Sequence, residues 1–168
     1  MKTASTLHTE RLLLAPLSLN DDAFILELLN TADWIKYIGQ RNIHSLDDAR
    51  AYIQKIVNNT SILYWVIKNG EEENPIGMVT FIKREYLPNH DLGFALLPQF
   101  YQRGYAFEAS SAVLKHVTEH YNLKNISAIT IPENERSICL IEKLGLRFEK
   151  EIIVENEKLL IYTAASDT

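Results

Sequence analysis

Residues 92–116 constrain the fold of this chain more than any other stretch. They read as a buried apolar strand that a proline ends, a short loop around Gly104, and a helix that begins at about Ala106. Such a loop exposes several backbone N–H groups at a helix N-terminus, where the helix dipole is also positive. Because Arg103 adds a full positive charge, the stretch predicts a site for a phosphate-bearing ligand at the end of a strand. The same junction is also compatible with a packing turn that binds no phosphate.

The other elements predict a mixed α/β domain whose sheet is largely antiparallel and flanked by helices. Their order along the chain is β-α-α-β-β-β-α-β-α-β-β, and Asn69-Gly70 is typical of a hairpin turn. Strands are expected at 11–17, 62–67, 75–82, 91–97, 125–131, 147–154 and 159–163. Helices are expected after Asn20-Asp-Asp22, after Ser45, over 106–121 and over 138–144, the last closed by Gly145, and 34–39 is expected to be a short apolar segment before a loop.

Length and composition exclude several classes of protein. The 168 residues suffice for one full core, so we expect a single domain over 1–168. A formal net charge of -5 argues against a general nucleic-acid binder. There is no apolar run long enough to span a membrane and no apolar signal core near the start of the sequence. We therefore expect a cytoplasmic protein that binds neither nucleic acid nor a membrane.

The sequence predicts no metal site and no disulfide. Cys139 is the single cysteine, so no intrachain disulfide can form, and its place in a helical apolar pattern predicts a core position. His116 and His120 lie four residues apart on one predicted helix, but no acidic third ligand is placed to match them. We therefore expect a surface pair of histidines.

The loop around Gly104 is similar to a known motif. The spacing Tyr101-x-x-Gly104-x-Ala106 resembles the pyrophosphate loop of the GNAT (Gcn5-related) N-acetyltransferases, usually written Gln/Arg-x-x-Gly-x-Gly/Ala, which binds acetyl-CoA in that family. Tyr101 departs from the usual Gln or Arg. Aromatic residues at this position are familiar in the branch that acetylates protein N-termini.

Two further segments resemble the same family in the same order. Thr9–Leu17 looks like the Thr-Glu-Arg-Leu-x-Leu-Arg-Pro-Leu opening of RimJ/RimL-type acetyltransferases, with Ala15 in place of the usual Arg. Pro132–Gly145 looks like that branch's Asn-x-x-Ser-x-x-x-x-x-Lys-x-Gly-Phe segment, with Leu146 in place of Phe. On these three segments the chain is identified as a member of the GNAT superfamily, RimJ/RimL-like branch, and the order of its elements is also that of the GNAT fold.

The resemblance implies a set of residues that bind acetyl-CoA. In the family, the central strand splays from its neighbour and offers backbone groups to the pantetheine and the acetyl carbonyl; carried over, these come from Leu96 and Leu97. The other expected contacts are Gln102, Arg103, Gly104, Tyr105 and Ala106 for the pyrophosphate, Asn134 and Ser137 for the pantetheine arm, and Lys143 for the phosphates. Each also has a simpler interpretation, as a core residue, a helix cap or a solvated charge.

The resemblance also implies catalytic and acceptor-binding residues. The Ser137 hydroxyl is a candidate proton donor to the leaving thiolate, with Asn134 beside it. Asp91 opens the central strand and could take a proton from the amine directly or through water, or make a structural hydrogen bond instead. The expected acceptor wall comprises Trp34, Tyr37 and Tyr86, which could equally be core aromatics.

The predicted function is acetyl-CoA-dependent transfer of an acetyl group to a primary amine, without a metal. The branch implies a protein N-terminal amine as acceptor, and a small-molecule amine is the alternative within the same chemistry. A non-catalytic acyl-CoA-binding sensor and a purely structural α/β domain are alternatives from other classes. The sequence leaves the oligomeric state open between a monomer and a homodimer.

Overall fold

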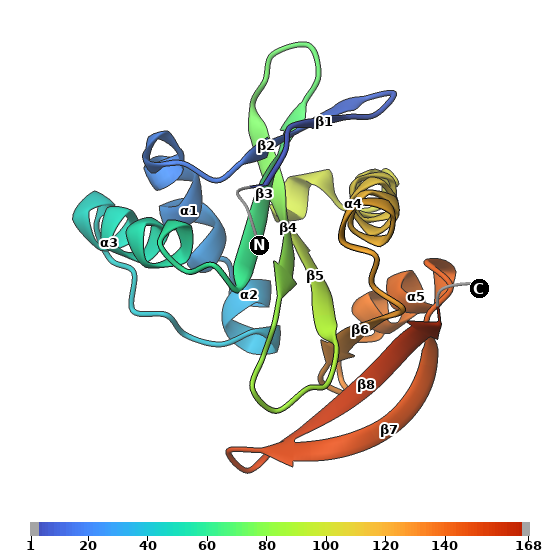
Figure 1. The fold of residues 1–168 in the computed structure, drawn as a ribbon. Helices are drawn as coiled ribbons and strands as arrows, with labels where there is room; N and C mark the ends of the chain where they lie inside the picture. The colour runs from blue at the N-terminus through green and yellow to red at the C-terminus, as the bar shows by residue number, and fades with distance from the viewer. Residues whose placement is uncertain (1–3, 166–168) are drawn as a thin grey trace.

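The structure, a computed structural model, describes residues 4–165 as an eight-stranded sheet with helices on both faces (Figure 1). The strands are β1 (Leu7–His8), β2 (Leu12–Pro16), β3 (Ile62–Asn69), β4 (Pro75–Ile82), β5 (His90–Leu96), β6 (Asn125–Thr130), β7 (Arg147–Val154) and β8 (Glu157–Ala165). The helices are α1 (Asp22–Leu29), α2 (Ala32–Tyr37), α3 (Leu46–Val57), α4 (Tyr105–Tyr121) and α5 (Glu135–Lys143), with short 3-10 turns η1 (Leu19–Asp21) and η2 (Pro98–Phe100).

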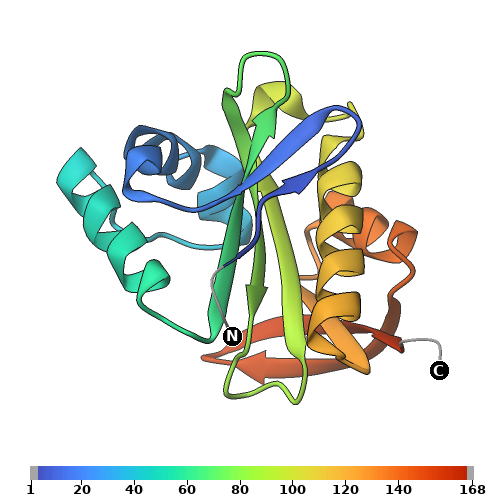
Figure 2. The same ribbon diagram turned by 45° about the horizontal axis from the view of Figure 1, so that its top comes forward.

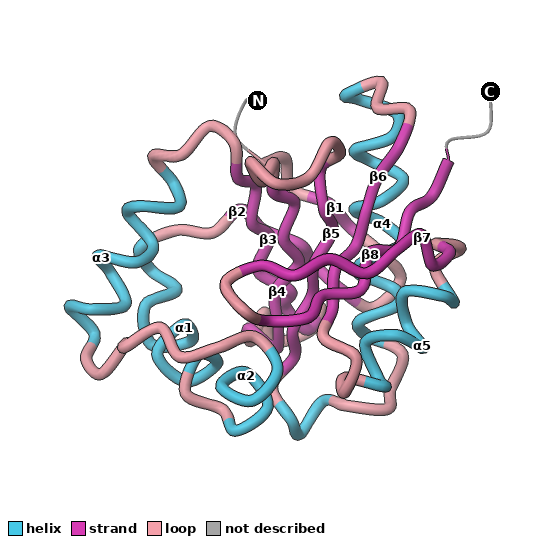
Figure 3. Tube along the Cα trace, turned by 90° about the horizontal axis from the view of Figure 1, so that it is seen from below, coloured by secondary structure: helices cyan, strands magenta, loops and turns pink. Residues whose placement is uncertain are grey.

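The sheet is almost entirely antiparallel. Its strand order is β1-β2-β3-β4-β5-β6-β8-β7, and only β5 and β6 run parallel. Helices α1, α2 and α3 lie on one side of the strands, and α4 and α5 lie on the other, which is clear when the molecule is seen from below (Figure 3). The predicted fold class is therefore confirmed.

Two buried layers hold the helices to the sheet. Successive residues of a strand point to opposite faces, and β3 is apolar on both: Trp65 packs with α4, whereas Val66 packs with α1 and α3. A third, smaller cluster joins α5 to β6 and β8 through Ile141 and Tyr162. Because the central strands are covered on both faces, they read as continuous apolar runs rather than as alternating patterns.

The structure differs from the predicted elements in a few places, each with a local reason. Strand β1 was not predicted; it forms a short hairpin with β2. The segment around Trp34 is helix α2, because the Thr31 side chain accepts the Trp34 N–H and caps it. Helix α5 starts earlier than predicted, since Asn134 caps it. Strand β8 is longer, because Glu155 and Asn156 both take positive φ and make a tight hairpin turn.

Helix α4 is the longest helix in the described part of the chain, at 17 residues. No helix there is both long and apolar enough to cross a membrane.

Candidate functional site

The sheet opens between its two parallel strands. β5 and β6 are paired only at His90 with Ile126 and at Asp91 with Ser127. Beyond these pairs, β5 continues along β4 and β6 continues along β8, so the two strands diverge. A cleft of about 1060 Å³ lies at this opening and is lined from both sides of the sheet.

The central strand turns the backbone of one leucine toward this opening. The N–H of Leu97 donates to the Ile76 carbonyl at 2.8 Å, so Leu97 bonds toward β4. Backbone groups of successive strand residues point to opposite sides, so those of Leu96 face the side from which β6 has parted. Leu96 lines the cleft, and Leu97 does not. The Leu97 N–H, which the sequence predicted to contact the coenzyme, is therefore used in the hydrogen bonding between β5 and β4. Of the two leucines, we keep only Leu96 in the candidate site.

The loop before α4 forms one end of the cleft. Gln102 and Gly104 have φ angles of 61° and 78°, a left-handed conformation that a glycine adopts without strain. Gly104 is the N-cap of α4 and offers no side chain, whereas Thr31, Ser45 and Asn134 cap their own helices with side-chain oxygens.

The start of α4 therefore has free hydrogen-bond donors. Glu108 is the first α4 residue whose N–H bonds within the helix, to the Gly104 carbonyl at 3.0 Å. The N–H groups of the three residues before it have no intrahelical partner. These residues, Tyr105, Ala106 and Phe107, line the cleft together with Gln102 and Gly104. Uncapped donors at the positive end of a long helix form a site that fits an anionic group such as a diphosphate.

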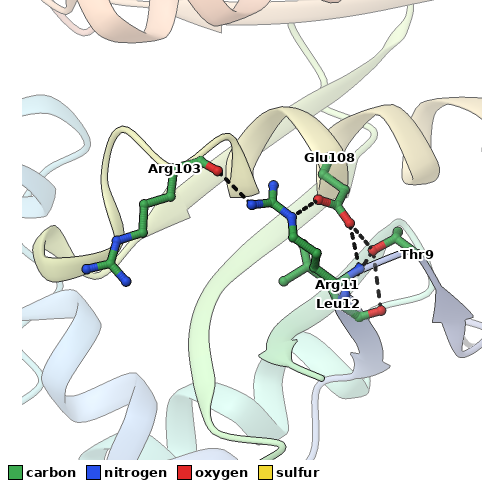
Figure 4. A network of polar contacts seen from close by, with 5 residues as sticks. All are labelled: Thr9, Arg11, Leu12, Arg103 and Glu108. Carbon is green, nitrogen blue, oxygen red and sulfur yellow. Dashed lines mark hydrogen bonds and ion pairs between the residues drawn. The ribbon is translucent and has the colours of Figure 1, made fainter. Parts of the chain in front are cut away.

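Arg103 takes a different role from the one expected. Its guanidinium lies 5.8 Å from the Phe100 ring centroid, and the residue does not line the cleft. Its carbonyl accepts a hydrogen bond from Nη1 of Arg11 at 2.9 Å, and Figure 4 shows its side chain turned away from Arg11 and Glu108. The Arg103 guanidinium, which the sequence predicted to bind a phosphate, thus points away from the cleft. The backbone of the loop still faces the cleft at Gln102 and Gly104.

Helix α5 brings three expected residues to the opposite wall. Asn134 Oδ1 accepts the Ser137 N–H at 3.3 Å, which confirms the helix-cap interpretation of Asn134. Within the described residues, the Ser137 hydroxyl has no hydrogen-bond partner, so it is free to donate a proton. Both residues line the cleft, as does Lys143, whose Nζ lies 4.3 Å from the Phe107 ring centroid.

The core prediction for Cys139 is wrong. Its side chain is exposed and lines the cleft, because Ile141, two positions along α5, faces the core with 1% of its surface exposed. Two residues in a helix are about 200° apart around the axis, so they face opposite sides.

A second, smaller hollow continues from this end of the cleft. Its volume is about 340 Å³ and it lies between α4 and α5. Phe107 and Lys143 line both hollows, and Lys115, Ser111 and Thr118 add a cation and two hydroxyls to the smaller one. The carboxylate of Glu119 also lines this hollow, so its charge is mixed, and the Thr118 hydroxyl already donates to the Leu114 carbonyl at 2.8 Å.

Asp91 lies where β5 and β6 part. Its carboxylate is 2% exposed and pairs with Nε of Arg84 at 2.7 Å. Burial raises the pKa of Asp91, and the Arg84 charge only partly offsets that effect. Both residues line the cleft. Asp91 thus forms an ion pair with Arg84 and also places its carboxylate at the cleft. This geometry is compatible with both roles that the sequence left open, a proton acceptor and a structural hydrogen-bond partner.

The expected acceptor residues gather on the side of the cleft nearest α2. Trp34 is 6% exposed, Tyr37 is half-buried and Tyr86 is 43% exposed, and all three line the cleft. Trp34 also packs in the core that joins α1, α2 and α3 to the sheet. Trp34 is therefore a core residue that also lines the cleft, and its contact with an acceptor stays a prediction.

Three residues from distant parts of the chain bridge the cleft. Asp33 of α2 accepts a hydrogen bond from Nη2 of Arg136 of α5 at 2.6 Å and another from the Tyr101 hydroxyl at 3.0 Å. The Arg136 guanidinium lies 4.2 Å from the Tyr101 ring centroid. All three line the cleft, so this bridge connects its two walls.

The bridge has a consequence for alkaline stability. Burial and the hydrogen bond to Asp33 raise the pKa of Tyr101 from 10.0 to about 12. Because the folded protein holds this proton more tightly than the unfolded chain, the phenol stabilises the fold fully below pH 10.0, and this contribution is lost as pH rises toward about 12. We expect Tyr101→Phe to lose stability less steeply over this range in urea titrations at stepped pH. Tyr37→Phe is the matched control, and equal slopes for Tyr101→Phe and the unaltered protein would contradict the assignment.

Sequence reasoning missed Asp33, Arg84 and Arg136. Arg136 could have been noticed as the neighbour of Ser137 in the segment that resembles the acetyltransferases. Asp33 and Arg84 carried no signal, because their partners are 103 and 7 positions away and only the folded chain brings them together.

The comparison with protein families identifies one domain. The model of the acetyltransferase (GNAT) domain matches residues 11–147 of the chain. Among known proteins, the uncharacterized N-acetyltransferase YnaD of Bacillus subtilis is 29% identical to this chain over 141 residues, an alignment that covers 84% of this chain and 82% of YnaD.

Solved structures share the fold over almost the whole chain. An acetyltransferase of the GNAT family from Bacillus anthracis superposes with a TM-score of 0.81 at 26% identity, covering 96% of this chain and 98% of that one. The ribosomal-protein-S5-alanine acetyltransferase of Vibrio fischeri gives 0.82 at 19% identity, covering 98% of each chain. The spermidine N-acetyltransferase of Vibrio cholerae, solved with CoA and spermine, gives 0.80 at 20% identity, covering 94% of this chain and 96% of that one.

Proposed function

Because this chain belongs to the acetyltransferase (GNAT) family and is an N-acetyltransferase, we propose that it transfers the acetyl group of acetyl-CoA to a protein N-terminal amine, as a RimJ/RimL-like enzyme acting through one domain over 1–168. The observation that carries the proposal is the opening between β5 and β6 beside the uncapped start of α4. This arrangement offers a channel for an extended arm and a separate site for a diphosphate at its end.

The residues of the cleft fit the parts of acetyl-CoA. In the proposed complex the free N–H groups around Gly104 hold the diphosphate, and the backbone of Leu96 binds the pantetheine arm. Asn134 borders the same arm, and Lys143 approaches the phosphates beside Phe107. The donor set at α4 is unused by the fold, which supports an anionic ligand there.

Acetyl-CoA, when bound, supplies a thioester whose acetyl group an amine can accept. The contribution of the chain is to orient the two substrates and to move protons. We assign to Asp91 the role of accepting a proton from the amine, directly or through water, since its carboxylate lies at the cleft floor. The Ser137 hydroxyl gives a proton to the leaving sulfur and regains one from water, and Asp91 releases the amine proton to water, so that protons balance over one turnover.

The acceptor is proposed on the resemblance of Thr9–Leu17 and of Pro132–Gly145 to the RimJ/RimL-type branch. The ribosomal-protein acetyltransferase from Vibrio fischeri supports it through its fold. A small-molecule amine is the second candidate: the spermidine acetyltransferase shares the fold as well, and the carboxylates of Glu155 and Glu157 line the cleft, where they suit a cationic acceptor.

One experiment tests the proposal and separates the candidates. Acetyl-CoA is titrated calorimetrically, and thiol release is then followed over a panel of N-terminal peptides, spermidine and amino acids. We expect binding, followed by turnover with the peptides. Turnover with spermidine alone would move the acceptor to small amines, binding without any turnover would favour an acyl-CoA sensor, and absence of binding would contradict the proposal.

The proton-donor assignment gives a separate prediction. Ser137→Ala is expected to lower kcat by roughly 10- to 100-fold, at the low end of general-acid effects, while the Kd for acetyl-CoA changes little. The variant keeps the helix cap, because Asn134 bonds the backbone N–H of residue 137 rather than its hydroxyl. Kinetics with a saturating acceptor and calorimetry measure the two quantities. Ser45→Ala, which removes a cap from α3, controls for loss of helix stability; an unaltered kcat in Ser137→Ala would leave Ser137 without a catalytic role.

A further inference from the structure

The turn between β1 and β2 lies against the start of α4. In Figure 2 this hairpin is in front of the sheet, and its turn reaches the end of α4 where the loop around Gly104 enters the helix. Three groups of the turn donate to one carboxylate, that of Glu108: the Thr9 hydroxyl at 2.7 Å, the Arg11 N–H at 2.9 Å and the Arg11 Nε at 2.7 Å. The Glu108 carboxylate is therefore held by both of its oxygens (Figure 4).

Arg11 binds the loop as well as the helix. Its Nη1 donates to the Arg103 carbonyl at 2.9 Å, and its guanidinium lies 4.5 Å from the Tyr105 ring centroid. A β-carbon on Gly104 would lie 3.4 Å from its Nη2, so the guanidinium is in contact range of the loop at that residue too. One planar side chain thus touches the loop before, at and after Gly104.

This network also offsets the negative charge of Glu108 at the start of α4. Glu108 lies in the first turn of α4, where a carboxylate is stabilised by the helix dipole but repels a second anion bound at the same helix end. Hydrogen bonds from Thr9 and Arg11 outweigh the effect of burial and hold the pKa of Glu108 below its usual value, so it is ionised at neutral pH. The Arg11 charge, 2.7 Å from the Glu108 oxygen, offsets this negative charge.

We propose that Arg11 is a positioning residue for the coenzyme loop: it binds Glu108 and the Arg103 carbonyl at once, fixes the backbone of residues 102–106, and neutralises the carboxylate beside the diphosphate site. The inference rests on the proposed function, since it assigns the diphosphate to this loop. It gives the Thr9-Glu-Arg11 segment a physical role, although that segment lies about 90 positions before the loop and does not line the cleft.

The test compares acetyl-CoA binding and turnover in three variants. Arg11→Ala is expected to raise the Kd and KM for acetyl-CoA roughly tenfold, the size of one charged hydrogen bond, with kcat close to that of the unaltered protein. Arg11→Lys restores the charge without the planar fork, so its Kd is expected to lie between the two. Arg50→Ala is the matched control, because it breaks a similar exposed ion pair, with Asp22 at 3.1 Å, away from the cleft.

Hydrogen exchange of the free protein provides the readout that a general loss of stability would not reproduce. Arg11→Ala is expected to speed amide exchange in peptides covering the first turns of α4, beginning with the Glu108 N–H that bonds to the Gly104 carbonyl, and not in those covering β3 or β4. If the unaltered protein binds acetyl-CoA and Arg11→Ala binds it equally well, the role of Arg11 is overturned while the proposed function stands. If the unaltered protein does not bind acetyl-CoA, the proposed function fails and the coenzyme role of Arg11 fails with it.

Discussion

Replacing Gly104 with glutamate is expected to abolish measurable acetyl-CoA binding. Gly104 is the N-cap of α4, and the new carboxylate would lie beside the free N–H groups of the first helical turn. A carboxylate at a helix N-terminus takes those hydrogen bonds itself and repels a second anion. We expect the Kd to rise by more than about 100-fold, which corresponds to about 3 kcal/mol, as measured by calorimetric titration.

Three other glycine variants separate charge from size and strain. Gly104→Gln has the size of the glutamate without its charge, and it is expected to bind more weakly than the unaltered protein but better than Gly104→Glu. Gly104→Ala adds only a methyl group, whose nearest neighbour would be Arg11 Nη2 at 3.4 Å, so it isolates the cost of a positive φ. Gly145→Glu is the distant control, because it also has a positive φ, of 95°, with open space around it. An unchanged Kd for acetyl-CoA in Gly104→Glu would contradict the assignment of this loop to acetyl-CoA.

Changing Asp91 to asparagine is expected to lower kcat about 100-fold or more without destabilising the protein. A general base contributes about 100-fold or more to rate, and asparagine cannot accept the proton. Stability is expected to be kept because burial raises the pKa of Asp91 despite Arg84, and because the Arg84 side chain is 33% exposed and can be hydrated once its partner is neutral. A raised carboxyl pKa means that folding favours the neutral form, and asparagine has nearly the shape of that form.

The measurements for Asp91→Asn are kcat against pH and thermal unfolding at neutral pH. In the unaltered protein, kcat is expected to fall as pH is lowered through the pKa of Asp91, and this acidic limb should be absent from the residual activity of the variant. Asp22→Asn is the control, because it removes the carboxylate of another ion pair, with Arg50, outside the cleft. A large drop in melting temperature with kcat little changed would show Asp91 to be a structural partner of Arg84 only.

Local patterns predicted most of the fold. Apolar runs and their breaks located the strands from β2 to β8, because burial of apolar side chains is the main favourable term in folding and leaves its period in the sequence. The missed strand β1 is two residues long, too short to show a period. The early start of α5 depends on one capping side chain, Asn134, which the sequence suggested only as an alternative.

Consecutive residues of the predicted site stay together in the structure. Gln102, Gly104 and Ala106 line the cleft, since a loop of fixed spacing positions its own backbone, and their binding of the pyrophosphate stays a prediction. Arg103 and Leu97 do not line it, because the direction of a side chain or an N–H depends on the neighbours that each element meets. For the same reason Cys139 faces the cleft instead of the core.

The sequence by itself determined the order of all elements except β1 and α2, the family resemblance, and the loop at the start of α4. The apolar period of each element and the residue spacing inside each motif involve close neighbours in the chain, so they can be read without the folded structure. Only the tertiary structure showed three further features. These are the point where β5 parts from β6, the pairing of Arg84 with Asp91, and the contact of Arg11 with a loop some 90 positions further along the chain. Those contacts join groups that the chain brings together only after its sheet and helices have packed, and a single sequence carries no local signal for them.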